Sequence, residues 1–322
     1  MAEAKLVKPG VVVNWLKGDP IENRANQWLE WDGSWDLDAA WLGVPFDGAG
    51  TVRSGSRHAP DAVRGAFPWY TSYTTSDRMV MDDLKVADIG DVHTIVTDMK
   101  TSYDNISATT QFLREKGIAM ATLGGDNSVS YPIMRGICRG APGKTLAIIH
   151  FDAHHDFRES HYGAMSSGVP YRLLLEEFPD QVKGEFMTQI GISDFCNNPT
   201  LHAYADKKEV EVISNVETWE RGIRDVMNTA LERARGADML FVSIDVDGID
   251  QAWAPGTASP NPFGLDGRDV AMAVRWAAQE PNCVGMDITE LSPPTDHQGM
   301  TANWAAIVYM NFFCGLAKRK LG

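Results

Sequence analysis

Cysteine is scarce in this sequence of 322 residues, with four copies that lie far apart along the chain. None forms a Cys-x-x-Cys pair, so the spacing favours neither a zinc knuckle nor a disulfide scaffold. The N-terminal residues lack the apolar core of a signal peptide. The longest apolar stretch, residues 304–317, includes Asn311 and is too short for a membrane span. We therefore expect a cytoplasmic protein that makes no use of a membrane.

Basic residues are also few, because 29 Lys and Arg stand against 43 Asp and Glu, for a formal net charge of −14. General nucleic-acid binding needs a basic surface, so the balance argues against this class of protein. An acidic chain is compatible with metal binding and with a cationic substrate, but many soluble enzymes share this charge.

No repeat, low-complexity run or linker divides the chain, which predicts one domain over residues 1–322. The N-terminal region is unusual for its aromatic content. It holds five tryptophans: Trp15, Trp28, Trp31, Trp35 and Trp41. Such density is typical of a core or a subunit interface. We interpret residues 1–35 as an extension at an interface, with an aromatic wall beside the substrate as the lesser alternative.

Short apolar runs rich in Val and Ile alternate with segments of helical periodicity. The predicted strands are residues 39–45, 85–89, 118–123, 146–151, 187–192, 210–213, 239–244 and 284–288. The predicted helices are residues 102–116, 130–138, 170–177, 216–235, 266–279 and 301–318. Strands without polar alternation are buried on both faces. The pattern predicts a three-layer α/β fold with a mainly parallel, eight-stranded sheet.

Polar clusters follow three of these strands, where the active site of an open parallel sheet lies. The first runs Gly124 to Ser128, the second Asp152 to Asp156 and the third Asp245 to Asp250. Spacings of two within the last two clusters put four carboxylates and one imidazole on common sides of extended backbone. So many buried charges repel one another unless cations neutralise them. Carboxylate with imidazole suits Mn(II), and also Ni(II), Fe(II) or Zn(II).

Each fragment by itself is weak evidence. An isolated Asp-x-Asp is usually a turn or a helix cap, and an isolated Asp-x-His is common in ordinary structure. Both fragments at the ends of separate strands favour a metal site instead. Within the second cluster, His155 is expected to face away from the other side chains and to pack or support the loop.

The clusters resemble the signatures of the ureohydrolases, the family of arginases, agmatinases and formimidoylglutamases. Residues 124–128, 152–156 and 243–250 match the motifs Gly-Gly-Asp-His-Ser, Asp-Ala-His-x-Asp and Ser-x-Asp-x-Asp-x-x-Asp in the same order, with one difference. Residues 45–60, 255–257 and 286–290 agree as well. The resemblance implies an arginase-like fold and hydrolysis of a C–N bond in a linear amidine.

The resemblance also implies roles for individual side chains around two divalent ions, Mn(II) first and Ni(II) as an alternative. The implied ligands are Asp152 and Asp245 bridging both ions, Asp156 and Asn127 completing one set, and His154 and Asp247 completing the other. A hydroxide held between the ions would attack the central carbon of the substrate. Glu290 would pair with the planar cationic nitrogen group. Asp250 would orient the metal loop or the tetrahedral intermediate.

Asn127 is a departure, because most of the family has a histidine ligand there. An amide oxygen is a weaker ligand for such metals than imidazole. Three interpretations stay open: two ions with one held loosely, a single ion, or a catalytically silent subunit. Retained metal binding is favoured, because the other five ligand positions are intact.

Ser167 is a second departure, since agmatinase-like members carry a histidine proton shuttle there. His161 is the alternative shuttle, although a surface role is as reasonable. The run from Ser166 to Arg172 is more similar to formimidoylglutamases. It implies that Ser167 and Arg172 bind substrate, with Arg172 meeting a carboxylate unless it pairs locally.

These observations favour formimidoylglutamate as the substrate, with agmatine, a guanidino acid, guanidine or a biguanide as alternatives. The rival outside catalysis is a silent subunit of a hetero-oligomer. A phosphate-handling Mg(II) enzyme is disfavoured, because the chain lacks a phosphate loop with lysine and His154 is a poor Mg(II) ligand. The resemblance implies a homo-oligomer, a trimer or a hexamer.

Overall fold

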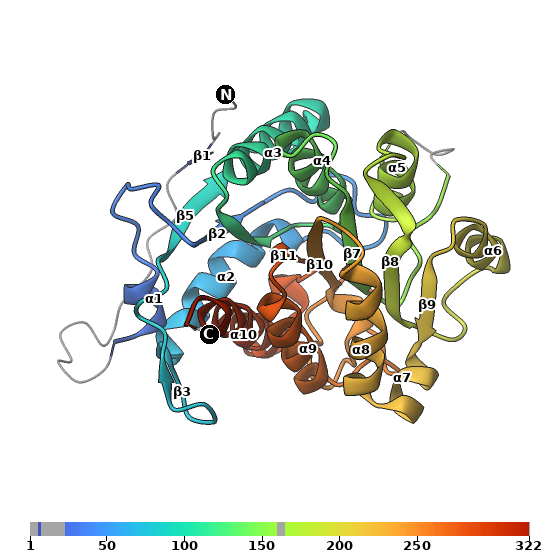
Figure 1. Cartoon of the computed structure of the whole chain (residues 1–322). Helices are drawn as coiled ribbons and strands as arrows, with labels where there is room; N and C mark the ends of the chain where they lie inside the picture. Colours follow the sequence, from blue (N-terminus) through green and yellow to red (C-terminus); the bar gives the residue numbers. More distant parts are fainter. Residues whose placement is uncertain (1–5, 8–22, 160–164, 322) are drawn as a thin grey trace.

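The computed structural model describes residues 6–7, 23–159 and 165–321. Its main sheet contains all eight predicted strands, which run parallel in the order β5-β2-β6-β11-β10-β7-β8-β9 (Figure 1). Their bounds are β2 Ala39–Gly43, β5 Val86–Val92, β6 Ala119–Leu123, β7 Leu146–Phe151, β8 Val182–Ile192, β9 Glu211–Ser214, β10 Met239–Asp245 and β11 Cys283–Thr289. A short strand, β1 (Leu6–Val7), pairs antiparallel with β5 at the edge. The predicted fold class is confirmed.

Helices cover both faces of the sheet and complete the three layers (Figure 1). One face carries α2 (Ala59–Ala66), α8 (Ile223–Ala234), α9 (Gly267–Gln279) and α10 (Met300–Leu321). The other carries α3 (Met99–Glu115), α4 (Ser130–Gly140) and α5 (Pro170–Glu177), with α6 (Pro199–Lys207) beside β9. Successive residues of each strand alternate between the two cores. Because both faces are buried, the strands need continuous apolar runs.

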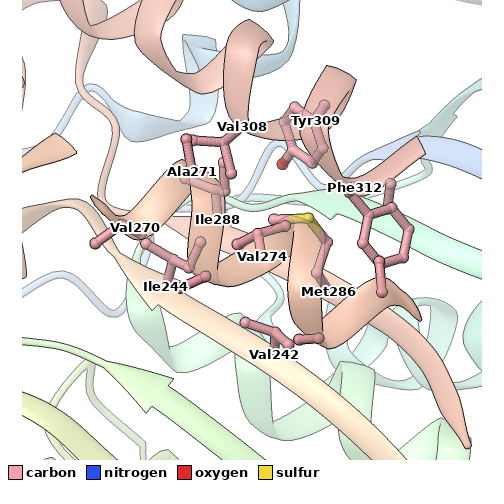
Figure 2. Close-up of a cluster of buried hydrophobic side chains, with 14 of the residues drawn as sticks. Val242, Ile244, Val270, Ala271, Val274, Met286, Ile288, Val308, Tyr309 and Phe312 are labelled. Atoms are coloured by element: carbon pink, nitrogen blue, oxygen red, sulfur yellow. The ribbon is translucent and has the colours of Figure 1, made fainter. Parts of the chain in front are cut away.

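The core on the α9 side shows how the sheet is held (Figure 2). Val242 and Ile244 of β10 lie beside Ile288 of β11, under Val274 of α9 and Val308 of α10. All five side chains are fully buried. Burial of each stabilises the fold by roughly 1.5–3 kcal/mol. Packing at the centre of the sheet therefore fixes the strand ends from which the polar clusters project.

Helix α10 is the apolar stretch near the C-terminus, and it is buried against α2 and α9. Within the described residues, no helix has the length and apolarity that crossing a membrane requires. The predicted helix 216–235 is two helices, α7 (Asn215–Arg221) and α8, because Gly222 between them has a φ of 78°. The sequence did not predict β1, α1 (Ala25–Trp28), α2, α6 or the β3–β4 hairpin (Tyr73–Thr74 and Met79–Val80).

The N-terminal tryptophans pack into this same chain where the structure describes them. Trp41 is fully buried, with Phe67 and Tyr309 edge-on at 5.6 and 5.9 Å between ring centroids. Trp28 packs edge-on against a ring of α10 at 5.8 Å. Trp15 lies outside the described residues. The rings named here belong to the core, and the interface role of residues 1–35 stays a prediction.

Candidate active site

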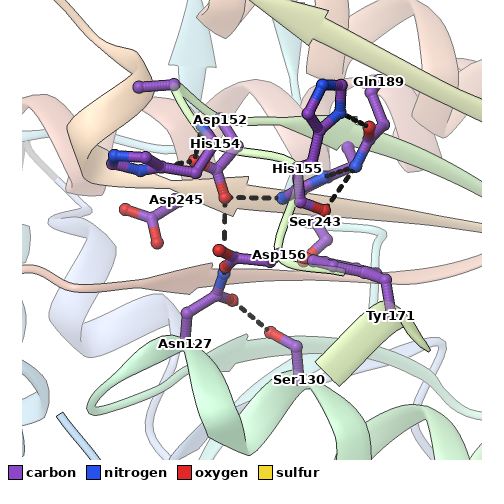
Figure 3. Close-up of polar contacts among 12 residues, drawn as sticks. Asn127, Ser130, Asp152, His154, His155, Asp156, Tyr171, Gln189, Ser243 and Asp245 are labelled. Atoms are coloured by element: carbon purple, nitrogen blue, oxygen red, sulfur yellow. Dashed lines mark hydrogen bonds and ion pairs between the residues drawn. The ribbon is translucent and has the colours of Figure 1, made fainter. Parts of the chain in front are cut away.

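The polar clusters meet at the C-terminal ends of β6, β7, β10 and β11 (Figure 3). A pocket of about 700 Å³ opens above them, and its lining includes His154, Asp156, Asp245, Asp247 and Glu290. Asp152 and Asn127 are fully buried beneath it. The structure thus brings together all six side chains that the resemblance implies as metal ligands.

Tight turns place these side chains. Asp245 accepts a hydrogen bond from the backbone N–H of Asp247 at 2.9 Å, which closes the turn after β10. That turn packs directly on the β7 loop, because a Cβ on Gly248 would lie 2.7 Å from the Cα of Asp152. Only glycine allows this approach. The close contact holds the aspartates of β10 against those of β7.

Two residues at the site have left-handed backbone. Asp156 has a φ of 52° and Glu290 a φ of 62°. This conformation is uncommon for residues with a side chain and is concentrated at functional sites. In each case the turn directs a carboxylate into the pocket.

Two overlapping groups of side chains have the geometry to hold a cation. Ligand atoms of Asp152, His154 and Asp247 lie within 4.8 Å of one another, and so do those of Asp152, Asp156 and Asp245. In the first group, His154 Nδ1 lies 3.2 Å from Asp247 Oδ2 and 3.4 Å from Asp152 Oδ1. Asp152 belongs to both groups, while Asp245 belongs to the second. The bridging role of Asp245 stays a prediction.

The charges in this cluster are poorly compensated. Burial and then the charge of Asp152 raise the pKa of Asp156 to about 8. Burial and then the charges of Asp247 and Asp152 raise the pKa of Asp245 well above its usual range. Burial lowers the pKa of His154, but the neighbouring aspartates outweigh burial and raise it well above its usual value. Asp247 Oδ1 is buried with no hydrogen bond among the described residues. The negative charge of the cluster therefore exceeds what one imidazole can neutralise, and a bound cation would compensate for it.

Asn127 turns its amide nitrogen toward the carboxylates. Its Nδ2 donates to Asp156 Oδ2 at 2.6 Å and lies 3.4 Å from Asp152 Oδ2. Its Oδ1 accepts from the hydroxyls of Ser130 and Thr289 at 3.0 and 3.1 Å. In this arrangement the amide oxygen faces away from the second group of ligands.

The surroundings of Asn127 also suit the opposite orientation of the amide. The Ser130 hydroxyl lies 2.8 Å from Asp287 Oδ2, and the Thr289 hydroxyl lies 3.4 Å from the carbonyl oxygen of Ile244. Each hydroxyl can donate to that second acceptor and accept from an amide N–H instead. Rotation of the Asn127 amide therefore keeps both hydroxyls hydrogen-bonded and turns its oxygen toward Asp156 and Asp152, where a cation would take the place of the lost N–H.

The other predicted site residues divide between the pocket and its surroundings. Glu290 accepts from the backbone N–H of Asn127 at 2.8 Å, and burial raises the pKa of its carboxyl well above its usual range. Ser167 lines the pocket, with its hydroxyl 3.4 Å from that of Thr51. Asp250 is not among the lining residues, and it caps its own loop by accepting from the N–H of Ala252 at 2.8 Å.

Arg172 does not reach the pocket. Its guanidinium pairs with Glu159 at 3.0 Å and with Glu176 at 2.9 Å, and it stacks over Tyr204. Of the two roles that the sequence left open for Arg172, the structure shows the local pairing. The guanidinium is not placed to meet a substrate carboxylate in the pocket. His161 lies outside the described residues, so its role as a proton shuttle stays a prediction.

Sequence reasoning missed two arginines of the pocket. Arg158 is exposed at the lining, where its stem lies against Gly168 and its backbone N–H donates to the Gly168 carbonyl at 2.9 Å. Arg53 also lines the pocket and donates from Nε to the carbonyl of Ala258 at 2.8 Å. Arg158 follows the second polar cluster by two residues, a spacing that would have pointed to it.

Comparison with known proteins agrees with this arrangement. A model of the arginase family matches residues 37–315. Formimidoylglutamase from Halalkalibacterium halodurans is 32% identical over 95% of this chain and 100% of that protein. Guanidinopropionase from Pseudomonas aeruginosa is 33% identical over 88% and 87%. The crystal structure of formimidoylglutamase from Bacillus subtilis is 31% identical, with a TM-score of 0.88 over 97% of this chain and 96% of that one. The chain therefore belongs to the arginase family, the ureohydrolases, which hydrolyse C–N bonds in guanidino or formimino compounds.

Proposed function

We propose that this chain is a metal-dependent hydrolase of a linear amidine with an anionic tail, and that formimidoylglutamate is its substrate. The observation that carries the proposal is the group of four buried aspartates and one half-buried histidine on the pocket floor. Unneutralised, such a group opposes folding, and divalent cations relieve the repulsion. The same group lies where a substrate can reach it.

The residues present fit cations of the Mn(II) class. Oxygen ligands with one imidazole and no thiolate suit Mn(II), with Ni(II) as the alternative. His154 and Asp247 would hold one ion and Asp156 and Asp245 the other, with Asp152 shared between them. When bound, such cations lower the pKa of a coordinated water and polarise the carbon to be attacked. A rotated Asn127 would add an amide oxygen to the second set.

Glu290 would hold the reacting group of the substrate. Its carboxylate lies at the pocket floor beside the aspartates, and its backbone is held by the Gly125 carbonyl at 2.8 Å. A protonated amidine is planar and carries N–H donors in a fork, which a carboxylate accepts in a charge-assisted pair. The turn at Glu290 therefore orients the amidine carbon toward the ion-binding aspartates.

The rim of the pocket favours a substrate with carboxylates. Arg158 and Arg53 add positive charge to the pocket lining, where Glu159 is paired with Arg172. Formimidoylglutamate has a cationic amidine at one end and two carboxylates at the other, which matches this polarity. Agmatine ends in an amine, which both arginines would repel. Several relatives with acid substrates in their names, such as guanidinopropionase, support the same choice.

A substrate panel tests the proposal. The purified chain, loaded with Mn(II) or Ni(II), is incubated with formimidoylglutamate, guanidinopropionate, guanidine and agmatine, and formamide, urea and ammonia are measured. We expect formamide and glutamate from formimidoylglutamate as the fastest reaction. Faster release of urea from another compound would reject this substrate. A chain with neither bound cation nor activity would be the silent subunit of a hetero-oligomer.

Replacing Asn127 with histidine is expected to raise the affinity for one of the two cations by about tenfold or more. Changes around metal ligands typically alter metal affinity on this scale. Imidazole is the better ligand for these metals, and residue 127 lies beside Asp156 and Asp152. Titration calorimetry and metal analysis measure the affinity and the number of ions. Asn198→His is the matched control, because Asn198 lines the same pocket but caps α6. Equal affinity in wild type and Asn127→His would place residue 127 outside the ligand set.

The remaining features of the proposal rest on the sequence and on what the resemblance to the ureohydrolases implies. We propose a cytoplasmic enzyme that forms a homo-oligomer, a trimer or a hexamer. We also propose that residues 1–322 form a single domain. Size-exclusion chromatography with light scattering measures the assembly directly.

A further inference from the structure

A row of polar side chains crosses the sheet one step below the aspartates. Gln189 of β8 is the register partner of His150 on β7. His150 is in turn the partner of Ser243 on β10, and Ser243 is the partner of Asp287 on β11. Register partners in a sheet project from the same face. All four side chains are fully buried, so each needs a hydrogen-bond partner.

The amide of Gln189 has its orientation set by a backbone carbonyl. One of its terminal atoms lies 2.8 Å from the carbonyl oxygen of His155, which has no proton to give. That terminal atom must therefore be the NH₂ group, with the amide oxygen on the other side. The oxygen lies 2.7 Å from Nδ1 of His155 and accepts a hydrogen bond from the N–H there (Figure 3).

This orientation determines which nitrogen of His150 carries the proton. The second N–H of Gln189 points at Nδ1 of His150, 3.1 Å away, so Nδ1 is the acceptor. The ring proton then lies on Nε2, which donates to Asp152 Oδ2 at 2.8 Å. The Tyr171 ring, with its centroid 3.9 Å away, packs on the imidazole and limits its rotation. With the protons placed in this way, every polar atom of the Gln189 amide and of the His150 ring has a hydrogen-bond partner.

We propose that Gln189 is a positioning residue, which fixes the ring proton of His150 on Nε2 and thereby the orientation of the Asp152 carboxylate. The inference rests on the proposed function, because it gives Asp152 the task of holding cations. With Oδ2 held by His150 and Oδ1 by the N–H of His154 at 2.6 Å, the carboxylate cannot rotate. Asp152 belongs to both candidate ligand groups, so one amide on β8 sets the geometry of both.

The opposite tautomer is opposed on both sides of the ring, because a proton on Nδ1 would meet the Gln189 N–H. Without the Gln189 N–H, only Asp152 opposes the move of the His150 proton to Nδ1. A bare Nε2 would then face Asp152 Oδ2 at 2.8 Å, where two acceptors repel. Partners behind metal ligands typically change metal affinity by about 10–100-fold when they are removed.

Nitrogen NMR on metal-free protein labelled at histidine tests the first part. Protonated and bare ring nitrogens differ widely in shift, and the eight histidines make a simple spectrum. A His150→Phe variant identifies the signal, and Gln189→Glu changes it. We expect wild-type His150 to be protonated on Nε2 and bare on Nδ1. In Gln189→Glu, where an acceptor replaces the donor at equal size, Nδ1 becomes protonated. A wild-type proton on Nδ1, or an unchanged Gln189→Glu spectrum, overturns the proposal.

Cation titration tests the second part. Gln189→Leu and Gln189→Glu are expected to bind Mn(II) about 10–100-fold more weakly than wild type. The matched control is Gln181→Leu, because Gln181 donates to three backbone carbonyls at the opposite end of the sheet. Affinity within a factor of two in both Gln189 variants overturns the role toward Asp152. If wild type binds neither Mn(II) nor Ni(II), the proposed function fails, and the metal-free NMR result still decides the tautomer.

Discussion

Replacing Asp245 with asparagine is expected to abolish binding of at least one cation and to lower amidine hydrolysis by roughly a thousandfold or more. The carboxylate lies at the pocket floor within 4.8 Å of ligand atoms from Asp152 and Asp156. Its removal leaves a neutral amide where a negative ligand is required. Metal analysis after dialysis and the rate of formamide release measure the two effects.

The same substitution is expected to stabilise the metal-free protein. Burial and the neighbouring aspartates raise the folded-state pKa of Asp245 above its unfolded value. Stability linked to that group is present at low pH and is lost as pH rises through the raised pKa. Asp245→Asn should therefore melt higher than wild type at pH 8 without metal, with little difference at pH 4. Added Mn(II) should reverse the order, because only wild type gains stability from binding.

Asp250→Asn is the control for the melting measurement. Its carboxylate is also in the loop after β10, but it accepts from the N–H of Ala252 and does not line the pocket. We expect its metal-free melting temperature at pH 8 to stay close to that of wild type. Full metal occupancy in Asp245→Asn would refute the ligand role and with it the proposed function.

Replacing Arg158 with glutamine is expected to lower kcat/KM for formimidoylglutamate by about tenfold, as expected for one charge-assisted hydrogen bond in an open pocket. The guanidinium lies at the pocket lining, supported by Gly168. Loss of its charge weakens the hold on a substrate carboxylate without touching the ion-binding aspartates. Most of the effect should appear in KM, because the tail is bound alike before and during reaction.

Agmatine and Arg172→Gln provide the controls. Agmatine carries a cationic tail, so its turnover in Arg158→Gln should rise or stay level, whereas kcat/KM for formimidoylglutamate should fall. Arg172 is also next to the pocket, but Glu159 and Glu176 hold its guanidinium. Arg172→Gln should therefore leave KM for formimidoylglutamate unchanged. An equal loss for both substrates in Arg158→Gln would mean a structural role for Arg158.

The strands were predictable because their signal is local. A strand buried on both faces needs a nearly continuous run of apolar residues, and residues 146–151 and 239–244 are apolar apart from His150 and Ser243. β8 begins at Val182, five residues before the predicted start. The prediction missed these first residues because they alternate between buried and exposed and form no apolar run. The break at Gly222 was missed, since one glycine inside a helical pattern is a weak signal.

The pocket was harder to predict than its floor. Arg172 and Arg158 both follow the second polar cluster, and the sequence favoured the first for contact with substrate. Pairing with two glutamates draws Arg172 away, while the close approach of Gly168 leaves Arg158 at the lining. Both outcomes depend on how loops pack, which spacing along the chain does not encode.

What the sequence determined by itself is the sheet and the set of chemical groups at its rim, since polar residues spaced by two after apolar runs converge wherever the strands lie parallel. The tertiary structure decided how those groups face one another. The orientation of the Asn127 amide and the proton on His150 follow from contacts with Thr289 and Gln189, far away in sequence. Hydrogen bonds of this kind form only when strand register brings donor and acceptor within about 3 Å, and register is a property of the assembled sheet.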